Sequence, residues 1–197
     1  MMDKDQSYVR VGRGLGEFPS NGSVKVFVVS NGFDEFELNG FEYTIWGQMH
    51  RFETLNSWMT AITEKMSKQS KVDLPKIVLR MIDKRLIMPW SFSGIEDRNL
   101  ITLQVSRFGY AHGFANQKWL ISDSRAQKSY ELTKDQYDVW NAAAGRVMLL
   151  EVVDSLMDQR GISLDEAYAL LLKHGIELHK LSLWGFEYVD AIESGVQ

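Results

Sequence analysis

Residues 130–140 read YELTKDQYDVW, and residues 36–46 read FELNGFEYTIW. Each stretch has an aromatic residue followed by Glu and Leu, then Tyr five places after that Leu and Trp three places after the Tyr. The two stretches lie 94 residues apart, yet only seven of 55 positions are identical between residues 36–90 and 130–184. The match therefore rests on residue classes and shared structural signals, which predict an internal duplication.

The predicted duplication extends beyond these two stretches. Trp90 and Trp184 have the same separation of 94 residues, and so do the upstream segments 8–13 and 102–107. A polar, turn-rich segment lies between the copies and predicts a linker. The predicted parts are copy one at residues 8–90, the linker at 91–101, copy two at 102–184 and a C-terminal tail at 185–197.

Local signals predict the same order of elements in both copies. Segments rich in β-branched and aromatic residues, bounded by turn residues, come first and predict strands. Helix starts follow at Asn39, Thr133 and Ser163, each of which has Glu or Gln three residues later, and at Asp73. Each copy ends in a short strand that closes on Trp. We therefore expect an α+β fold built from a duplicated β-β-β-α-α-α-β unit, an order typical of winged-helix proteins.

The helical part of each copy resembles the PqqD-like winged-helix group, which includes the leader-peptide recognition elements of peptide-modifying systems. The similar stretches are FELNGFEYTIW…LNSWMTAI…VDLPKIVLRMIDKRLI and YELTKDQYDVW…LLEVVDSLM…GISLDEAYALLLKHGIEL, about 55 residues per copy. The resemblance implies binding without chemistry, in which a peptide is added as a strand beside the sheet, next to the third helix. The wider winged-helix class often binds DNA instead, through the helix after the turn.

The overall composition is that of a globular chain without cysteine. Of the 197 residues, 45% are hydrophobic and 12% are aromatic, enough for sizeable cores. The absence of cysteine excludes disulfides, thiol nucleophiles and cysteine-based zinc sites. The charged N-terminus and the lack of a long apolar run predict a cytoplasmic protein with no membrane partner. The net charge of −4 argues against wholesale binding of nucleic acid.

No catalytic, cofactor or metal signature stands out. The segment GRGLG at residues 12–16 lacks the spacing of a phosphate-binding loop, and a hairpin or bulge between strands is the better interpretation. His174 and His179 are five residues apart, whereas metal pairs on a helix are three or four apart. Tryptophans that recur in both copies predict core packing. We therefore expect no enzymatic activity, no catalytic residues, no cofactor and no bound metal.

The two third helices differ in charge. Residues 63–85 carry seven basic and three acidic side chains, whereas residues 157–179 carry two basic and four acidic ones. Only copy one therefore has a third helix charged to contact phosphates or an acidic partner. A solvated helix face is the simpler alternative. The candidate contact residues are Lys71, Lys76, Arg80, Lys84 and Arg85.

The sequence thus leaves two functional hypotheses. The first is a non-enzymatic binding or regulatory protein with two winged-helix-like modules that engages a peptide or protein partner. The alternative is a DNA-binding transcriptional regulator that uses the basic third helix of copy one. The identity of the partner and the oligomeric state stay open.

Overall fold

The computed structural model describes residues 3, 5–19, 25–66, 72–123 and 127–189. The fold is α+β, with small antiparallel sheets and packed helices. The chain divides into two compact units, Met1–Ser91 and Phe92–Gln197, which we call unit 1 and unit 2.

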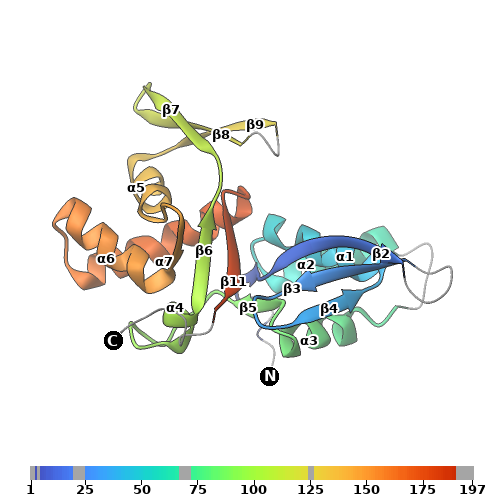
Figure 1. The fold of residues 1–197 in the computed structure, drawn as a ribbon. Coiled ribbons are helices and arrows are strands. Elements are labelled where there is room, and N and C mark those ends of the chain that lie inside the picture. The colour runs from blue at the N-terminus through green and yellow to red at the C-terminus, as the bar shows by residue number, and fades with distance from the viewer. Residues whose placement is uncertain (1–2, 4, 20–24, 67–71, 124–126, 190–197) are drawn as a thin grey trace. The chain divides into compact units, whose positions relative to one another are not determined.

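Unit 1 combines two small sheets with three α-helices and one short 3-10 helix, η1 (Figure 1). Strands β2, β3 and β4 form an antiparallel meander, while β1 pairs with β5. In chain order the elements are β1 (Tyr8–Arg10), β2 (Arg13–Pro19), β3 (Lys25–Ser30), β4 (Glu35–Leu38), α1 (Gly40–Gln48), η1 (Met49–Arg51), α2 (Leu55–Met66), α3 (Leu74–Asp83) and β5 (Ile87–Pro89).

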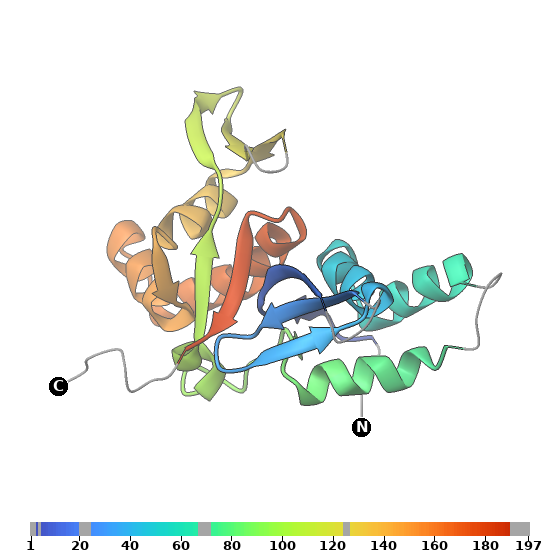
Figure 2. The same ribbon diagram turned by 45° about the vertical axis from the view of Figure 1, so that its right-hand side comes forward.

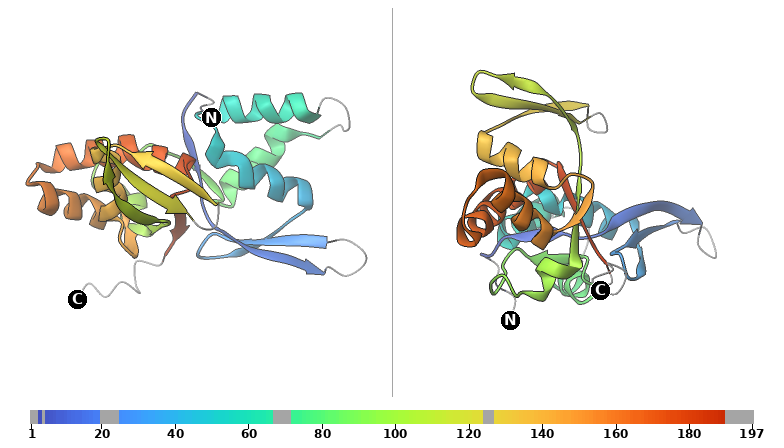
Figure 3. Two further views of the ribbon diagram at one scale, coloured as in Figure 1. Left: turned by 90° about the horizontal axis from the view of Figure 1, so that it is seen from above. Right: turned by 60° about the vertical axis from the view of Figure 1, so that its left-hand side comes forward.

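Unit 2 has one more strand and one more α-helix than unit 1 among its described residues, and no 3-10 helix there. Its meander β7–β8–β9 stands above helices α5 to α7 in the right-hand view of Figure 3. In chain order the elements are α4 (Arg98–Thr102), β6 (Leu103–Arg107), β7 (Tyr110–Ala115), β8 (Lys118–Asp123), β9 (Lys128–Leu132), α5 (Lys134–Ala142), β10 (Arg146–Met148), α6 (Leu149–Arg160), α7 (Leu164–Lys180) and β11 (Trp184–Tyr188).

The units share their strand pairing as well as their order of elements. Each has a meander with a register shift in its first strand, between Gly14 and Gly16 in β2 and between Ala111 and Gly113 in β7. In each unit the strand before the meander pairs with the last strand, β1 with β5 and β6 with β11. Unit 2 differs in α4 and in β10, which pairs with the other edge of β6. A common origin of the two units stays a prediction.

The predicted order of elements was incomplete. Four strands, not three, precede α1 in unit 1 and lie between α4 and α5 in unit 2, because β2 and β7 are strands in their own right. The segment at residues 12–16 contains both the bend at Gly12, with φ +102°, and the bulge in β2. Residues 98–101 of the predicted linker lie in α4, where Leu100 is fully buried, and β11 continues to Tyr188, beyond the predicted end of copy two.

The sheet register also corrects one predicted equivalence. Ile87 lies opposite Arg10 in unit 1, and Trp184 lies opposite Arg107 in unit 2. Arg10 and Arg107 occupy corresponding places, since their guanidinium groups lie over Trp46 and Trp140. By this register the counterpart of Trp184 is Ile87 and not Trp90, and the predicted match of residues 8–13 with 102–107 shifts by the same three residues. A constant separation of 94 residues cannot hold along the chain, because corresponding elements differ in length; α3, for example, has 10 residues and α7 has 17.

The predicted helix starts are confirmed. Asn39 and Thr133 cap α1 and α5 in complete capping boxes, Ser163 does the same for α7, and the Asp73 side chain accepts a hydrogen bond from the Lys76 backbone. These caps satisfy backbone N–H groups that have no partner inside the helix.

An aromatic ladder joins each meander to the helix that follows it. In unit 1 the Phe27 ring stacks on Tyr43 with 4.6 Å between centroids, and Tyr43 lies 5.7 Å from Trp46. In unit 2 the corresponding distances are 3.7 Å from Trp119 to Tyr137 and 5.7 Å from Tyr137 to Trp140. The predicted core positions are confirmed for the recurring tryptophans Trp46, Trp90, Trp140 and Trp184, and Trp58, which has no Trp counterpart, is buried as well.

Candidate functional site

Two of the basic residues predicted as contacts have partners within unit 1. Arg80 on α3 makes an ion pair with Glu42, which is buried in the first turn of α1. The ammonium group of Lys84, just after α3, lies 4.7 Å from the centroid of the Phe36 ring on β4, in cation–π geometry. Both cations are therefore held by groups of their own unit.

Of the other three predicted contacts, the two that the structure describes lie at opposite ends of α3. Lys76 is exposed in the first turn of α3, while Arg85 follows α3 in the left-handed region with φ +53°. Lys71 lies outside the described residues. A phosphate-binding surface along this basic run stays a prediction.

Strand β4 is the more informative feature of this region. It pairs only with β3 among the described strands, so its other edge carries no strand. The Asn31 backbone N–H donates to the Asp34 carbonyl at 3.1 Å, which makes this pair the hydrogen-bonded end of the β3–β4 hairpin. Hydrogen-bonded pairs alternate along an antiparallel ladder, so the N–H and C=O groups of Glu35 and Glu37 point away from β3.

The side chains of β4 alternate in the same way. Phe36 and Leu38 are partly and fully buried, whereas Glu35 and Glu37 are exposed. The outer edge of β4 therefore offers unpaired backbone groups between two exposed carboxylates. The alternation of acidic and apolar residues in EFEL indicates the strand, but sequence reasoning could not show that its outer edge is unpaired.

A buried asparagine fixes the hairpin against the end of α3. Asn31 is only 2% exposed, and its amide nitrogen donates to the Lys84 carbonyl at 2.9 Å. Its side-chain oxygen accepts from the backbone N–H groups of Phe33 at 2.9 Å and Asp34 at 3.0 Å. These bonds give β4 and α3 a fixed relation, and Figure 2 shows α3 running alongside β4.

A small cavity lies where the hairpin meets the end of α3. Its volume is about 230 Å³, enough for part of a side chain. Two phenylalanine rings provide apolar surface and four charged side chains provide a polar rim. The lining residues are Asn31, Phe33, Asp34, Phe36, Asp83, Lys84 and Arg85.

Glu177 on α7 is the residue of unit 2 that corresponds to Arg80 of unit 1. The Gln136 amide donates to Glu177 on α7 at 3.1 Å, and the His174 ring nitrogen Nδ1 lies 2.6 Å from the same carboxylate. Burial raises the pKa of Glu177, but hydrogen bonds from His174 and Gln136 outweigh it and leave the pKa below its usual value. Unit 2 therefore has an anionic residue where unit 1 has Arg80.

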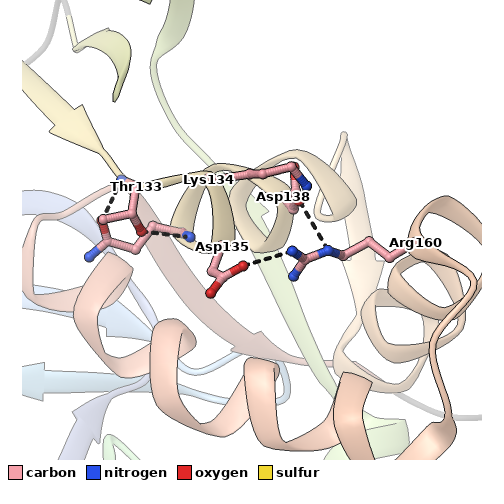
Figure 4. A network of polar contacts seen from close by, with 6 residues as sticks. Thr133, Lys134, Asp135, Asp138 and Arg160 are labelled. Atoms are coloured by element: carbon pink, nitrogen blue, oxygen red, sulfur yellow. Dashed lines mark hydrogen bonds and ion pairs between the residues drawn. The ribbon is translucent and has the colours of Figure 1, made fainter. Parts of the chain in front are cut away.

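Unit 2 also has a larger groove, of about 860 Å³, along α5, α6 and α7. Arg160 bridges Asp135 at 2.8 Å and Asp138 at 3.3 Å, and Lys134 contacts Asp138 at 2.9 Å (Figure 4). These opposite charges satisfy one another and join the end of α6 to α5. We therefore assign this network to the packing of unit 2 and not to ligand binding.

Comparison with known proteins does not add a function. The chain matches no known family model, and no curated protein matches it. In the part of the chain that the structure describes, no helix combines the length and apolar character needed to cross a membrane. A function therefore has to be inferred from the geometry of β4 and its surroundings.

Proposed function

We propose that the chain is a non-catalytic binding protein that takes up an extended segment of a peptide or protein partner as an added strand beside β4. The observation that carries this proposal is the outer edge of β4, where the backbone groups of Glu35 and Glu37 point away from β3. Strand addition draws affinity from such backbone groups and selectivity from side-chain pockets.

Two further features support this mode of binding. The cavity beside Phe33 and Phe36 is at the end of the same edge, so a side chain of the added strand could enter it. The buried Asn31 holds the hairpin to α3, and a preorganised edge loses little conformational entropy on binding. The resemblance to PqqD-like domains implies the same placement, an added strand next to the third helix.

The DNA-binding hypothesis has less support in the geometry. Arg80 neutralises the buried Glu42, and Lys84 lies over the Phe36 ring, so each already has a partner within unit 1. It is kept as an outcome of the experiment: a salt-dependent shift of duplex DNA that Lys76→Ala weakens would favour it.

The test uses a proline at the edge of β4. Proline at position 37 removes an N–H that points away from β3, so Glu37→Pro leaves the β3–β4 ladder intact and blocks one bond to an added strand. Glu37→Gln is the matched control, because it removes the charge and keeps the N–H. We expect proteins captured from the native lysate by the wild type and by Glu37→Gln to be lost with Glu37→Pro.

Amide hydrogen exchange on the wild-type protein gives an independent measurement. In the free protein the amides of Glu35 and Glu37 should exchange faster than those of Phe36 and Leu38, which bond to β3. A captured partner should slow the exchange of Glu35 and Glu37. Capture of the same proteins by Glu37→Pro, with no slowing of these amides, would overturn the proposal.

A further inference from the structure

We propose that the segment added beside β4 is basic, with Lys or Arg side chains opposite Glu35 and Glu37; this inference rests on the proposed function. The two carboxylates lie on the same exposed face of β4, because side chains two residues apart in a strand point the same way. Among the described residues, neither carboxylate has an ion-pair partner. An added strand would bring its own side chains directly opposite them.

The surroundings of the edge strengthen this charge preference. Asp34 and Asp83 line the cavity at the end of β4, so four carboxylates lie along the edge and its cavity. Of the two cations beside them, Lys84 already contacts the Phe36 ring. Opposite charges on facing strands stabilise pairing and like charges destabilise it, so a basic segment complements this edge.

A second copy of this chain is a poor occupant of the same edge. Two β4 strands paired with each other would place Glu35 and Glu37 of one copy near those of the other, and like charges on adjacent strands repel. Charged residues on an edge strand are also a known protection against such self-pairing. If Glu35 and Glu37 served only to prevent self-pairing, repulsion between copies would be enough. Our proposal requires in addition that the two carboxylates attract a basic segment, and binding experiments can test that attraction separately.

The preference should be confined to unit 1. The corresponding strand of unit 2, β9, has Ser129 and Glu131 at the places of Glu35 and Glu37, and Glu131 already makes an ion pair with Lys118 at 2.9 Å. Its exposed face therefore carries one carboxylate, which is partly neutralised. We expect charge changes on β4 to alter the preference for basic segments. The same change of net charge in unit 2 should leave that preference unaltered.

The experiment compares three short labelled peptides by fluorescence anisotropy. The probes alternate Thr with Lys, Thr with Gln or Thr with Glu, so that all three contain a β-branched residue at every second position and carry positive, no or negative side-chain charge. With two facing charge pairs, the Lys peptide should bind the wild-type protein about fivefold more tightly than the Gln peptide. The Glu peptide should bind most weakly, and the differences should shrink as salt is added.

Three variants identify the source of any preference. The double variant Glu35→Lys/Glu37→Lys should invert the order of the peptides. Asp154→Lys/Asp158→Lys makes the same change of net charge on the exposed face of α6 and should keep the wild-type order. Glu37→Pro should weaken all three peptides together, because it removes a backbone bond and not only a charge.

The outcomes separate this inference from the proposed function. Equal binding of all three peptides by the wild type, lost in Glu37→Pro, would refute the charge preference and support the added strand. Binding of the Lys peptide that survives Glu37→Pro unchanged would show diffuse attraction and overturn the inference. If none of the three binds while a natural partner still protects the Glu35 and Glu37 amides, the charge preference is again refuted and the added strand stands.

Discussion

Glu42 and Arg80 form an ion pair that joins the first turn of α1 to α3. In unit 2 the same two positions hold Gln136 and Glu177, which are joined by a hydrogen bond of 3.1 Å. The positions correspond because Glu42 and Gln136 are both the N3 residue of a helix that starts with a capping box. Arg80 and Glu177 both accept, through their carbonyls, the hydrogen bond from the residue that caps the third helix. Both units therefore join the first turn of α1 or α5 to the third helix, but the residue on the third helix is a cation in unit 1 and an anion in unit 2.

Removing the charge of Arg80 should destabilise unit 1. Arg80→Met leaves Glu42 buried without a counter-charge, and we expect a loss of about 2 kcal/mol, because Arg80 is itself half exposed and partly screened. Urea unfolding followed by fluorescence measures the change. Lys76→Met is the control, since Lys76 is exposed on the same helix and should change stability by less than about 0.5 kcal/mol. Equal effects of the two variants would contradict the role of the ion pair.

The stack of Trp119 on Tyr137 should hold the meander of unit 2 to α5. The rings are 3.7 Å apart and 6° from parallel, closer than the Phe27–Tyr43 pair of unit 1. A double-mutant cycle with Trp119→Leu and Tyr137→Leu should give a coupling free energy of about 1 kcal/mol. The same cycle on Phe27 and Tyr43 provides the comparison. Additive effects in both cycles would show that the stacks contribute only buried area.

His50 should make stability fall with acid. Burial, helped by the nearby Arg10, lowers its pKa from 6.5 to about 4, although its hydrogen bond to the Gly47 carbonyl opposes this. Because the folded state disfavours protonation, the stabilisation is complete above pH 6.5 and is lost as the pH falls toward 4. His50→Gln should remove this component, on the order of 2 kcal/mol over that range.

The difference between wild type and variant isolates His50, since the carboxylates titrate in both proteins. Unfolding free energies measured across the range from about pH 6.5 to about pH 4 give the two slopes. Parallel slopes would mean that His50 is protonated as easily in the folded chain as in the unfolded one.

Two glycines of unit 1 should respond oppositely to alanine. Gly12 has φ +102°, and a Cβ atom there would lie 2.5 Å from the Ser30 carbonyl oxygen. Gly12→Ala should therefore cost at least about 2 kcal/mol. Gly47 lies inside α1, and a Cβ atom there meets nothing within 4 Å. Gly47→Ala should stabilise unit 1 by about 0.5 kcal/mol. Thermal unfolding decides both, and a neutral Gly12→Ala would show that the bend relaxes easily.

The helices could be predicted from the sequence because their signals are local. Asn39 and Glu42 specify a helix start within four residues, and so do Thr133 and Gln136; the capping boxes are present at both places. The aromatic repeat likewise led to the correct assignment of Trp46 and Trp140 to the core. Such features depend on neighbours along the chain, so no knowledge of tertiary structure was needed.

The strands and their register could not be predicted in the same way. Strand β7 is exposed along its whole length, so no alternation of apolar and polar residues marks it. The pairing of Trp184 with Arg107 depends on the length of α7, which the sequence of β11 does not encode. Register is set by contacts between distant segments, and a three-residue error followed from assuming a constant separation.

The candidate site was predicted only in part. The sequence identified the region of the third helix, but its charge count could not show that Arg80 turns to Glu42 and Lys84 to Phe36. Those contacts arise because α3 packs beside α1 and β4, which are more than thirty residues earlier in the chain. The free edge of β4 is likewise a property of the assembled sheet and not of any segment alone.

The pairing of β1 with β5 has a consequence for how unit 1 forms during synthesis. Tyr8 lies opposite Pro89, so the first and last strands of the unit meet each other. A growing chain cannot complete this sheet until almost the whole unit has left the ribosome, and contacts of such sequence separation are slow to form. The same closure brings the ends of the unit together, which is the geometry that tolerates circular permutation.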